Sequence, residues 1–153
     1  MQTFLPYPDL QQSLKVLDYK RLGKQRVEAS QLLSAILNRP TKKNQLYKGW
    51  VRHPICQMWS NNVNALKLYH NLAIEEWVSR RYKNNMPFES IEGEIILPIW
   101  LGNKDFHASH RANLLRKNYE FYSKYEWLEN HNMPYLWYDM IKENWYSVKT
   151  KYN

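Results

Sequence analysis

Cysteine is almost absent from this chain, and the signals of secretion are missing too. Cys56 is the only cysteine among 153 residues, which excludes an intramolecular disulfide framework and fits a reducing compartment. The first residues lack the positive and apolar segments of a signal peptide, and no apolar run approaches membrane-spanning length. We therefore expect a soluble, intracellular protein that does not contact a membrane.

The motifs of several enzyme classes are also missing. The sequence has no glycine-rich phosphate loop, no Gly-x-Ser-x-Gly elbow and no paired catalytic cysteine and histidine. His107 and His110 are spaced one helical turn apart, but no cysteine, third histidine or His-Glu-x-x-His motif completes a zinc site. These absences argue against nucleotide hydrolases, acyl hydrolases and metalloenzymes, and we expect neither a metal nor another cofactor.

Acidic residues are scarce in the first half of the chain. Residues 1–74 hold eleven Lys and Arg against three acids, whereas residues 75–153 hold eleven of each sign. The formal net charge of +8 therefore belongs wholly to the first half. Such asymmetry is typical of a protein that binds a polyanion, most commonly nucleic acid. The alternative is a solvated basic surface without a partner.

Apolar residues recur at helical spacing in three segments. The spacing predicts one helix over residues 14–37 and a second from His53-Pro54 to about Tyr82, with proline in the first turn, where its missing N–H does no harm. A third helix is predicted over residues 104–125, with a break near Asn118. The tail from Pro134 is expected to form a short closing helix that buries its aromatic rings.

Two further segments lack helical periodicity. Residues 1–9 contain Pro6 and Pro8 and predict an extended arm, and residues 84–102 contain two prolines and two glycines and predict a loop. The length suits one domain over residues 1–153, and a hydrophobic content of 44% is enough to fold it throughout. We predict an all-α fold, a compact single domain of three main helices with an extended N-terminal arm and long loops.

The first predicted helix carries a basic face with one acid in it. At 100° per residue, one stripe collects Lys20, Arg21, Lys24, Gln25, Glu28 and Gln31. Glu28 is the only carboxylate on this cationic face. Gly23 lies in mid-helix, where glycine costs about 1 kcal/mol relative to alanine. Arg26 projects toward the apolar side, so we expect it to meet a carboxylate, a carbonyl or a cleft.

Residues 39–52 carry five cations and no acid, with Tyr47 and Trp50 among them. Cations interleaved with aromatic rings suit phosphate contact combined with base stacking. A flexible loop whose two rings pack onto the body is an equal alternative. His107 and His110 likewise have two interpretations: they contact phosphate or line a cleft, or they are ordinary histidines on a helix surface.

Four sequence segments together resemble one protein family. They are the opening Met1-Gln-Thr-Phe-Leu-Pro-Tyr-Pro, the run Lys20-Arg-Leu-Gly-Lys-Gln-Arg-Val-Glu28, the pair His53-Pro54, and His107-x-x-His-Arg-x-x-Leu-Leu-Arg-Lys117. In this order they are similar to the pyrimidine-dimer DNA glycosylases of the endonuclease V type. The resemblance implies a compact all-α domain that excises a damaged pyrimidine from DNA and then nicks the resulting abasic site.

The resemblance also implies a mechanism. The family uses a primary amine at the N-terminus, helped by a glutamate on the first long helix and by nearby arginines. An α-amino group has a pKa of about 7.7 to 8.0, so much of it is an unprotonated nucleophile near neutral pH. Gln2 is too large for normal methionine removal, so the amine here is that of Met1. Family members tend to place the glutamate directly after the arginine, whereas Glu28 lies two turns beyond Arg21, about 10 Å along the helix.

The candidate catalytic residues are therefore Met1, Arg21 and Glu28. The partner is DNA, expected as a duplex with a flipped nucleotide that lies against an aromatic ring, and the protein is expected to be a monomer. The residues expected to contact DNA are Lys20, Lys24, Arg26, Lys48, Trp50, Arg52, His53, His107, His110, Arg111 and Lys117.

Two alternatives to this function remain open. One is a catalytically inactive DNA-binding module of the same fold, in which Glu28 is merely an ion-pair partner of Lys24 and Arg21. The other is a lyase that uses Lys20 or Lys24 as the amine, which requires burial to lower the pKa of the lysine.

Overall fold

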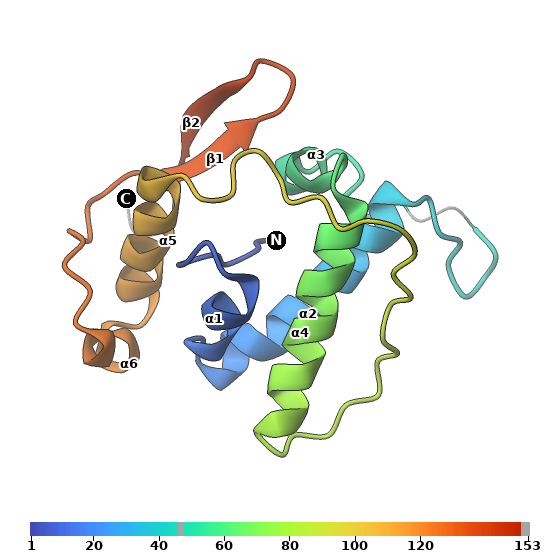
Figure 1. Ribbon diagram of the computed structural model, residues 1–153, viewed down its shortest axis with the longest axis horizontal. Helices are drawn as coiled ribbons and strands as arrows, with labels where there is room; N and C mark the ends of the chain where they lie inside the picture. The colour runs from blue at the N-terminus through green and yellow to red at the C-terminus, as the bar shows by residue number, and fades with distance from the viewer. Residues whose placement is uncertain (46–47, 151–153) are drawn as a thin grey trace.

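The computed structural model describes residues 1–45 and 48–150, and helices dominate it (Figure 1). In chain order the elements are α1 (Leu10–Lys15), α2 (Tyr19–Ile36), α3 (Pro54–Trp59), α4 (Val63–Ser79), α5 (Lys104–Lys117), α6 (Tyr119–Tyr122), the 3-10 helix η1 (Ser123–Tyr125), and the strands β1 (Tyr135–Asp139) and β2 (Asn144–Val148). No helix among the described residues is long and apolar enough to cross a membrane.

The all-α prediction is wrong, because the tail forms a β-hairpin rather than a closing helix. Strands β1 and β2 pair antiparallel, with Trp137 opposite Tyr146. Tyr135 and Trp137 are buried, while the residues between and after them are only partly buried. This period of two is that of a strand with one face on the core, and aromatic residues favour such a half-buried pleated surface.

The first two predicted helices are each interrupted. The helix predicted over residues 14–37 is two helices, α1 and α2, because Asp18 leaves the helical conformation and its N–H donates to the Tyr122 hydroxyl at 3.1 Å. The second predicted helix breaks between α3 and α4 at Asn62, whose side chain donates to the Ile96 carbonyl at 3.0 Å. The predicted start at Pro54 and the predicted break near Asn118 are confirmed.

Helices α2 and α4 pack side by side and form the centre of the core (Figure 1). This packing explains why position 23 is a glycine, since a Cβ there would lie 3.1 Å from the Trp77 ring. The Arg26 guanidinium also lies over that ring, 4.4 Å from its centroid. A glycine in mid-helix therefore lets a tryptophan of α4 approach the backbone of α2, which offsets its cost in helix propensity.

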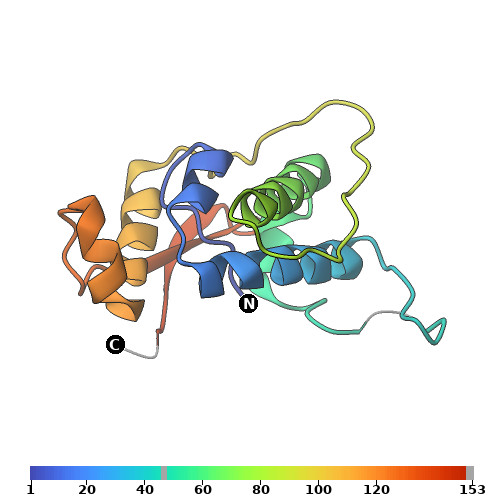
Figure 2. The ribbon, with the colours of Figure 1, turned by 90° about the horizontal axis from the view of Figure 1, so that it is seen from below.

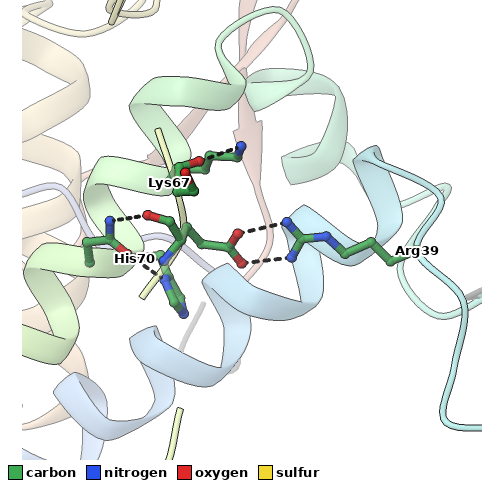
Figure 3. Close-up of polar contacts among 6 residues, drawn as sticks. Arg39, Lys67 and His70 are labelled. Atoms are coloured by element: carbon green, nitrogen blue, oxygen red, sulfur yellow. Dashed lines mark hydrogen bonds and ion pairs between the residues drawn. The ribbon is translucent and has the colours of Figure 1, made fainter. Parts of the chain in front are cut away.

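Residues 84–102 form a long strap along α4, held by side chains of that helix. Asn71 brackets the Glu89 backbone, accepting from its N–H at 2.8 Å and donating to its carbonyl at 2.9 Å, and the Lys67 ammonium donates to the Ser90 carbonyl at 2.9 Å. Arg39 forms a two-pronged ion pair with the Glu89 carboxylate at 2.7 Å (Figure 3). These contacts fasten a segment that lacks regular structure.

The later part of the strap and the N-terminus lie on opposite sides of the molecule. Figure 2 shows the N-terminus and the segment after α2 along one side; the strap begins beside α2, where Asn84 and Glu89 accept from Arg26 and Arg39, and then turns over the opposite side. The strap carries three acids, Glu89, Glu92 and Glu94, whereas α2 and the segment after it are rich in cations. The basic side of the molecule is therefore the one on which the chain begins.

Candidate active site

A cavity of about 400 Å³ opens beside the N-terminus. It brings together six of the residues predicted from the sequence. The arm contributes Met1, α2 contributes four side chains, and α5 contributes its last residue. Its lining residues are Met1, Gln2, Phe4, Lys20, Arg21, Lys24, Glu28 and Lys117.

The N-terminal arm reaches the cavity because two histidines of α5 hold its backbone. The Leu5 N–H donates to His110 Nδ1 at 3.0 Å, and His107 Nδ1 lies 2.7 Å from the Leu5 carbonyl. His107 Nε2 accepts from the Gly102 N–H at 2.8 Å, so its proton must be on Nδ1, which donates to Leu5. On the other side of the arm, the Trp59 indole N–H donates to Thr3 Oγ1 at 3.1 Å.

His107 and His110 are therefore neither surface residues nor cavity lining. They are 2% and 1% exposed, which leaves no surface for a phosphate contact. Burial lowers the pKa of both imidazoles, and the positive charge of Arg111 lowers both further. Both rings are thus held neutral, as they must be for His107 to accept from the Gly102 N–H and His110 from the Leu5 N–H.

Glu28 meets the arm within the cavity. Its Oε2 accepts from the Gln2 N–H at 3.1 Å and from Gln25 Nε2 at 3.2 Å. The arm thus covers the distance that separates Arg21 from Glu28 along α2. Among the described residues, no carboxylate oxygen lies within 4.0 Å of the Met1 α-amine. Of the described residues that line the cavity, Glu28 is the single anion.

Arg21 is fixed at the cavity by the buried carboxylate of Asp18. Its Nη1 lies 3.2 Å from Asp18 Oδ1, and the same oxygen accepts from the Tyr122 hydroxyl at 2.5 Å. Burial, followed by the hydrogen bond to Asp18, raises the pKa of the Tyr122 phenol. Tyr122 therefore stays protonated and orients Asp18, and Asp18 orients the guanidinium.

Two predicted DNA contacts are occupied elsewhere. Arg26 donates to Asn84 Oδ1 at 2.6 Å and covers Trp77, so it meets a carbonyl as expected, away from the cavity lining. Burial lowers the pKa of this guanidinium. Arg111 pairs with Glu129 at 2.5 Å and donates to the Pro6 carbonyl at 2.7 Å, so it fastens the arm.

The predicted residues after α2 lie outside the cavity. Lys48, Trp50 and Arg52 are exposed, and Tyr47 lies outside the described residues. His53 caps α3 through the Ile55 N–H at 3.2 Å, and its ring packs between two indoles, with centroids 5.5 Å from Trp50 and 5.6 Å from Trp137. The pKa of His53 is lowered by burial and also by the charge of the α-amine, which places the imidazole near the chain's start.

Sequence reasoning missed the buried polar residues behind the cavity. Gln25 contacts Glu28, the arm and α4, while Asn113 and Tyr135 donate to Gln2 Oε1 at 3.3 Å and 2.9 Å. For Gln25 a signal existed, since it precedes Glu28 by three residues on the same helix face. Asn113 and Tyr135 had no such signal, because only the tertiary fold brings α5 and β1 to the arm.

The described residues contain no group of three His, Cys, Asp or Glu side chains placed to hold a metal ion. What the cavity does offer is Met1, the residue that bears the α-amine, together with one carboxylate and four cationic side chains, Lys20, Arg21, Lys24 and Lys117. Such a combination suits a phosphate-rich ligand with an electrophilic carbon.

A helix-dominated chain with a basic cavity of this kind has the features of a nucleic-acid-binding protein. The profile of one family, described as Pyrimidine dimer DNA glycosylase, matches residues 1–90, more than half of the chain. The chain therefore belongs to this family, which confirms the resemblance found in the sequence and implies that the protein binds DNA. No curated protein and no solved structure matches the chain.

The family match covers part of the cavity. The arm and helices α1 to α4 lie within residues 1–90, and with them Met1, Arg21 and Glu28. Lys117, the two arm-holding histidines of α5 and the hairpin lie beyond the matched residues. The three candidate catalytic residues thus lie within the matched residues.

Proposed function

We propose that this protein is a DNA glycosylase with abasic-site lyase activity that acts on damaged or modified pyrimidines through the α-amine of Met1. The observation that carries the proposal is the 3.1 Å contact between the Gln2 N–H and Glu28 Oε2. This contact joins the residue next to Met1 to the carboxylate, and both Met1 and Glu28 line one cationic cavity. Membership of a DNA glycosylase family supports the substrate class.

The chemistry proceeds in two covalent steps. The unprotonated amine attacks C1′ of the deoxyribose; the C1′–N bond to the base breaks, the base leaves with the bonding electrons and takes up a proton, and the sugar ring opens to an iminium at C1′. Loss of a proton from C2′ then expels the 3′ phosphate by β-elimination, which nicks the strand. Water hydrolyses the iminium and restores the amine.

Each charged residue of the cavity has a part in this scheme. Glu28 stabilises the positive charge that develops on the sugar and transfers protons, since it is the anion beside the arm. Arg21, held by Asp18, binds a flanking phosphate, and the cations Lys20, Lys24 and Lys117 hold the strand. The target nucleotide must leave the duplex to bring C1′ to the amine.

The lysine alternative has less support. Lys20 and Lys24 are both exposed, and burial is the usual means by which a protein keeps a lysine amine unprotonated near neutral pH. The alternative of an inactive DNA-binding module predicts that the protein binds abasic duplex without cleaving the strand. Both alternatives are separated from the proposal by an experiment on the chain's first residue.

The test is to move the amine out of the cavity while leaving every side chain in place. A variant with three additional residues before Met1 should bind abasic duplex but lose strand nicking by about a hundredfold or more, the loss typical when a positioned reacting group is removed. The matched control carries the same three residues at the C-terminus and should nick at the parent rate. Equal nicking by both variants would contradict the proposal and favour a lysine nucleophile.

A further inference from the structure

Gln25 lies beneath the cavity with 0% of its surface exposed, yet its side chain is polar, and both its Nε2 and its Oε1 have hydrogen-bond partners. Its Nε2 donates to Glu28 Oε2 at 3.2 Å. Its Oε1 accepts from the Phe4 N–H at 2.9 Å and from the Tyr69 hydroxyl at 2.5 Å. One amide therefore contacts the carboxylate, the arm and α4 at the same time.

The arm and Glu28 also meet directly, because the Gln2 N–H donates to the same Oε2 atom that Gln25 reaches. A closed circuit of hydrogen bonds results, running from Glu28 through Gln25 to Phe4, and back along the arm through Gln2. We propose that Gln25 is a positioning residue that locks the Glu28 carboxylate to the arm that bears the α-amine. The consequence for catalysis rests on the function proposed above.

The chemistry of the position requires an amide. The same side chain must donate to a carboxylate and accept from a backbone N–H, which a primary amide does at every pH. An apolar side chain of similar size would leave the Phe4 N–H buried without a partner, and an ionised carboxylate could not donate. A glutamine that only filled the core would not need contacts with both the arm and Glu28.

The substitution Gln25→Glu distinguishes a positioning role from a purely structural one, because only a positioning role predicts a change in the pH dependence of adduct formation. It places a second carboxyl group at 3.2 Å from Glu28, so the two groups share one proton and the upper pKa of the pair rises. While that proton is present, the new carboxylic acid can donate to Glu28 as the amide does. When it dissociates, the lock opens, so we expect adduct formation to fall at the alkaline side of the pH profile.

Other charged and titratable groups face this pair and belong in the analysis of the profile. Tyr69 and Tyr135 have their pKa values raised by burial and, to a lesser degree, by the charge of Glu28. The full set of groups near the Glu28 and Gln25 side chains comes from the arm, α2, α4, α5 and β1. Its members are the Met1 α-amine, Lys20, Arg21, Lys24, Tyr69, Lys117 and Tyr135.

The experiment has two readouts, the titration of Glu28 in the absence of DNA and the rate of adduct formation on abasic duplex. The first follows the carboxyl carbon of Glu28 by NMR during a pH titration of the parent, Gln25→Glu, Gln25→Met and Tyr69→Phe. The second follows the rate of borohydride-trapped adduct on abasic duplex across the same pH range, with the dissociation constant measured alongside. Tyr69→Phe is the matched control, because it removes the buried hydroxyl that contacts Gln25 and the Phe4 carbonyl but leaves the hydrogen bond between Gln25 and Glu28.

We expect Gln25→Glu to shift the Glu28 titration and lose adduct formation at alkaline pH. Gln25→Met should slow trapping about tenfold or more at unchanged affinity, the loss expected for a hydrogen bond to a charged group. Tyr69→Phe should keep the parent profile. A Glu28 titration that is the same in all four proteins would overturn the proposal. A shifted titration in Gln25→Glu, with no adduct in the parent, would leave the lock standing and refute the proposed function.

Discussion

The substitution Glu28→Gln removes one negative charge from the cavity and keeps the size of the side chain. In the parent, the Gln2 N–H lies 3.1 Å from Glu28 Oε2. The amide oxygen of the variant can still accept from this N–H, so the arm should stay in place. The α-amine belongs to the preceding residue, at most about 3.6 Å further along the chain. Since no ion pair joins them, the amine and the carboxylate are separated by more than 4.0 Å.

A charge on the sugar at the amine therefore lies about 5 Å from the carboxylate. With an effective dielectric constant of about 20, the attraction at that distance is worth about 3 kcal/mol. Losing it should slow the chemical step by about two orders of magnitude. DNA binding should be unchanged or tighter, because the removed charge repels phosphate.

The assay is single-turnover nicking of an abasic duplex with enzyme in excess, so that the chemical step is measured apart from product release. Thermal unfolding of both proteins checks that the variant is folded. A rate within about fivefold of the parent would correspond to less than about 1 kcal/mol, the value for a fully solvated pair. That result would refute the role assigned to Glu28.

Three further predictions follow from the contacts of Arg21, His110 and Glu89. Arg21→Met should weaken binding to abasic duplex and reduce the slope of log affinity against log salt by about 0.9, the value for one phosphate contact; an unchanged slope in anisotropy titrations would remove Arg21 from the interface. Burial keeps the pKa of His110 below that of a histidine in the unfolded chain. As the pH falls below about 6.5, the unfolded chain therefore binds a proton that the folded protein does not. The free energy of unfolding should then drop by up to about 1.4 kcal/mol per pH unit. Urea unfolding at several pH values should show a smaller drop in His110→Gln, and an equal drop would contradict this reasoning. Glu89→Gln breaks the two-pronged ion pair with Arg39 and should lower the free energy of unfolding by about 1 kcal/mol. Nicking should continue at the parent rate, because Glu89 is not among the residues that line the cavity; a loss of nicking in the folded variant would show that the strap contributes to the site.

The helices could be predicted from apolar spacing, but their interruptions could not. Asp18 ends helical geometry where the Tyr122 hydroxyl, 104 positions away in the sequence, binds its N–H. Asn62 does so where its side chain reaches Ile96. The hairpin was missed because each strand is five residues long and the positive φ in its turn falls on Glu143 rather than on a glycine or asparagine.

The residues that line the cavity could be predicted from the sequence more readily than the residues that hold the arm beside it. Lys20, Arg21, Lys24 and Glu28 share one face at helical spacing, and the family resemblance implied that the N-terminal amine acts together with the glutamate on that face. The burial of His107 could not be predicted, because it depends on the path of the arm over α5. In physical terms, local periodicity determines which side chains share a face, while long-range packing determines what lies against that face.

The most direct test of the central claim is borohydride reduction of the protein on abasic duplex, followed by proteolysis and mass spectrometry of the cross-linked peptide. We expect the deoxyribose adduct on the α-nitrogen of Met1. An adduct on Lys20 or Lys24, or tight DNA binding with no adduct at all, would contradict the proposed mechanism.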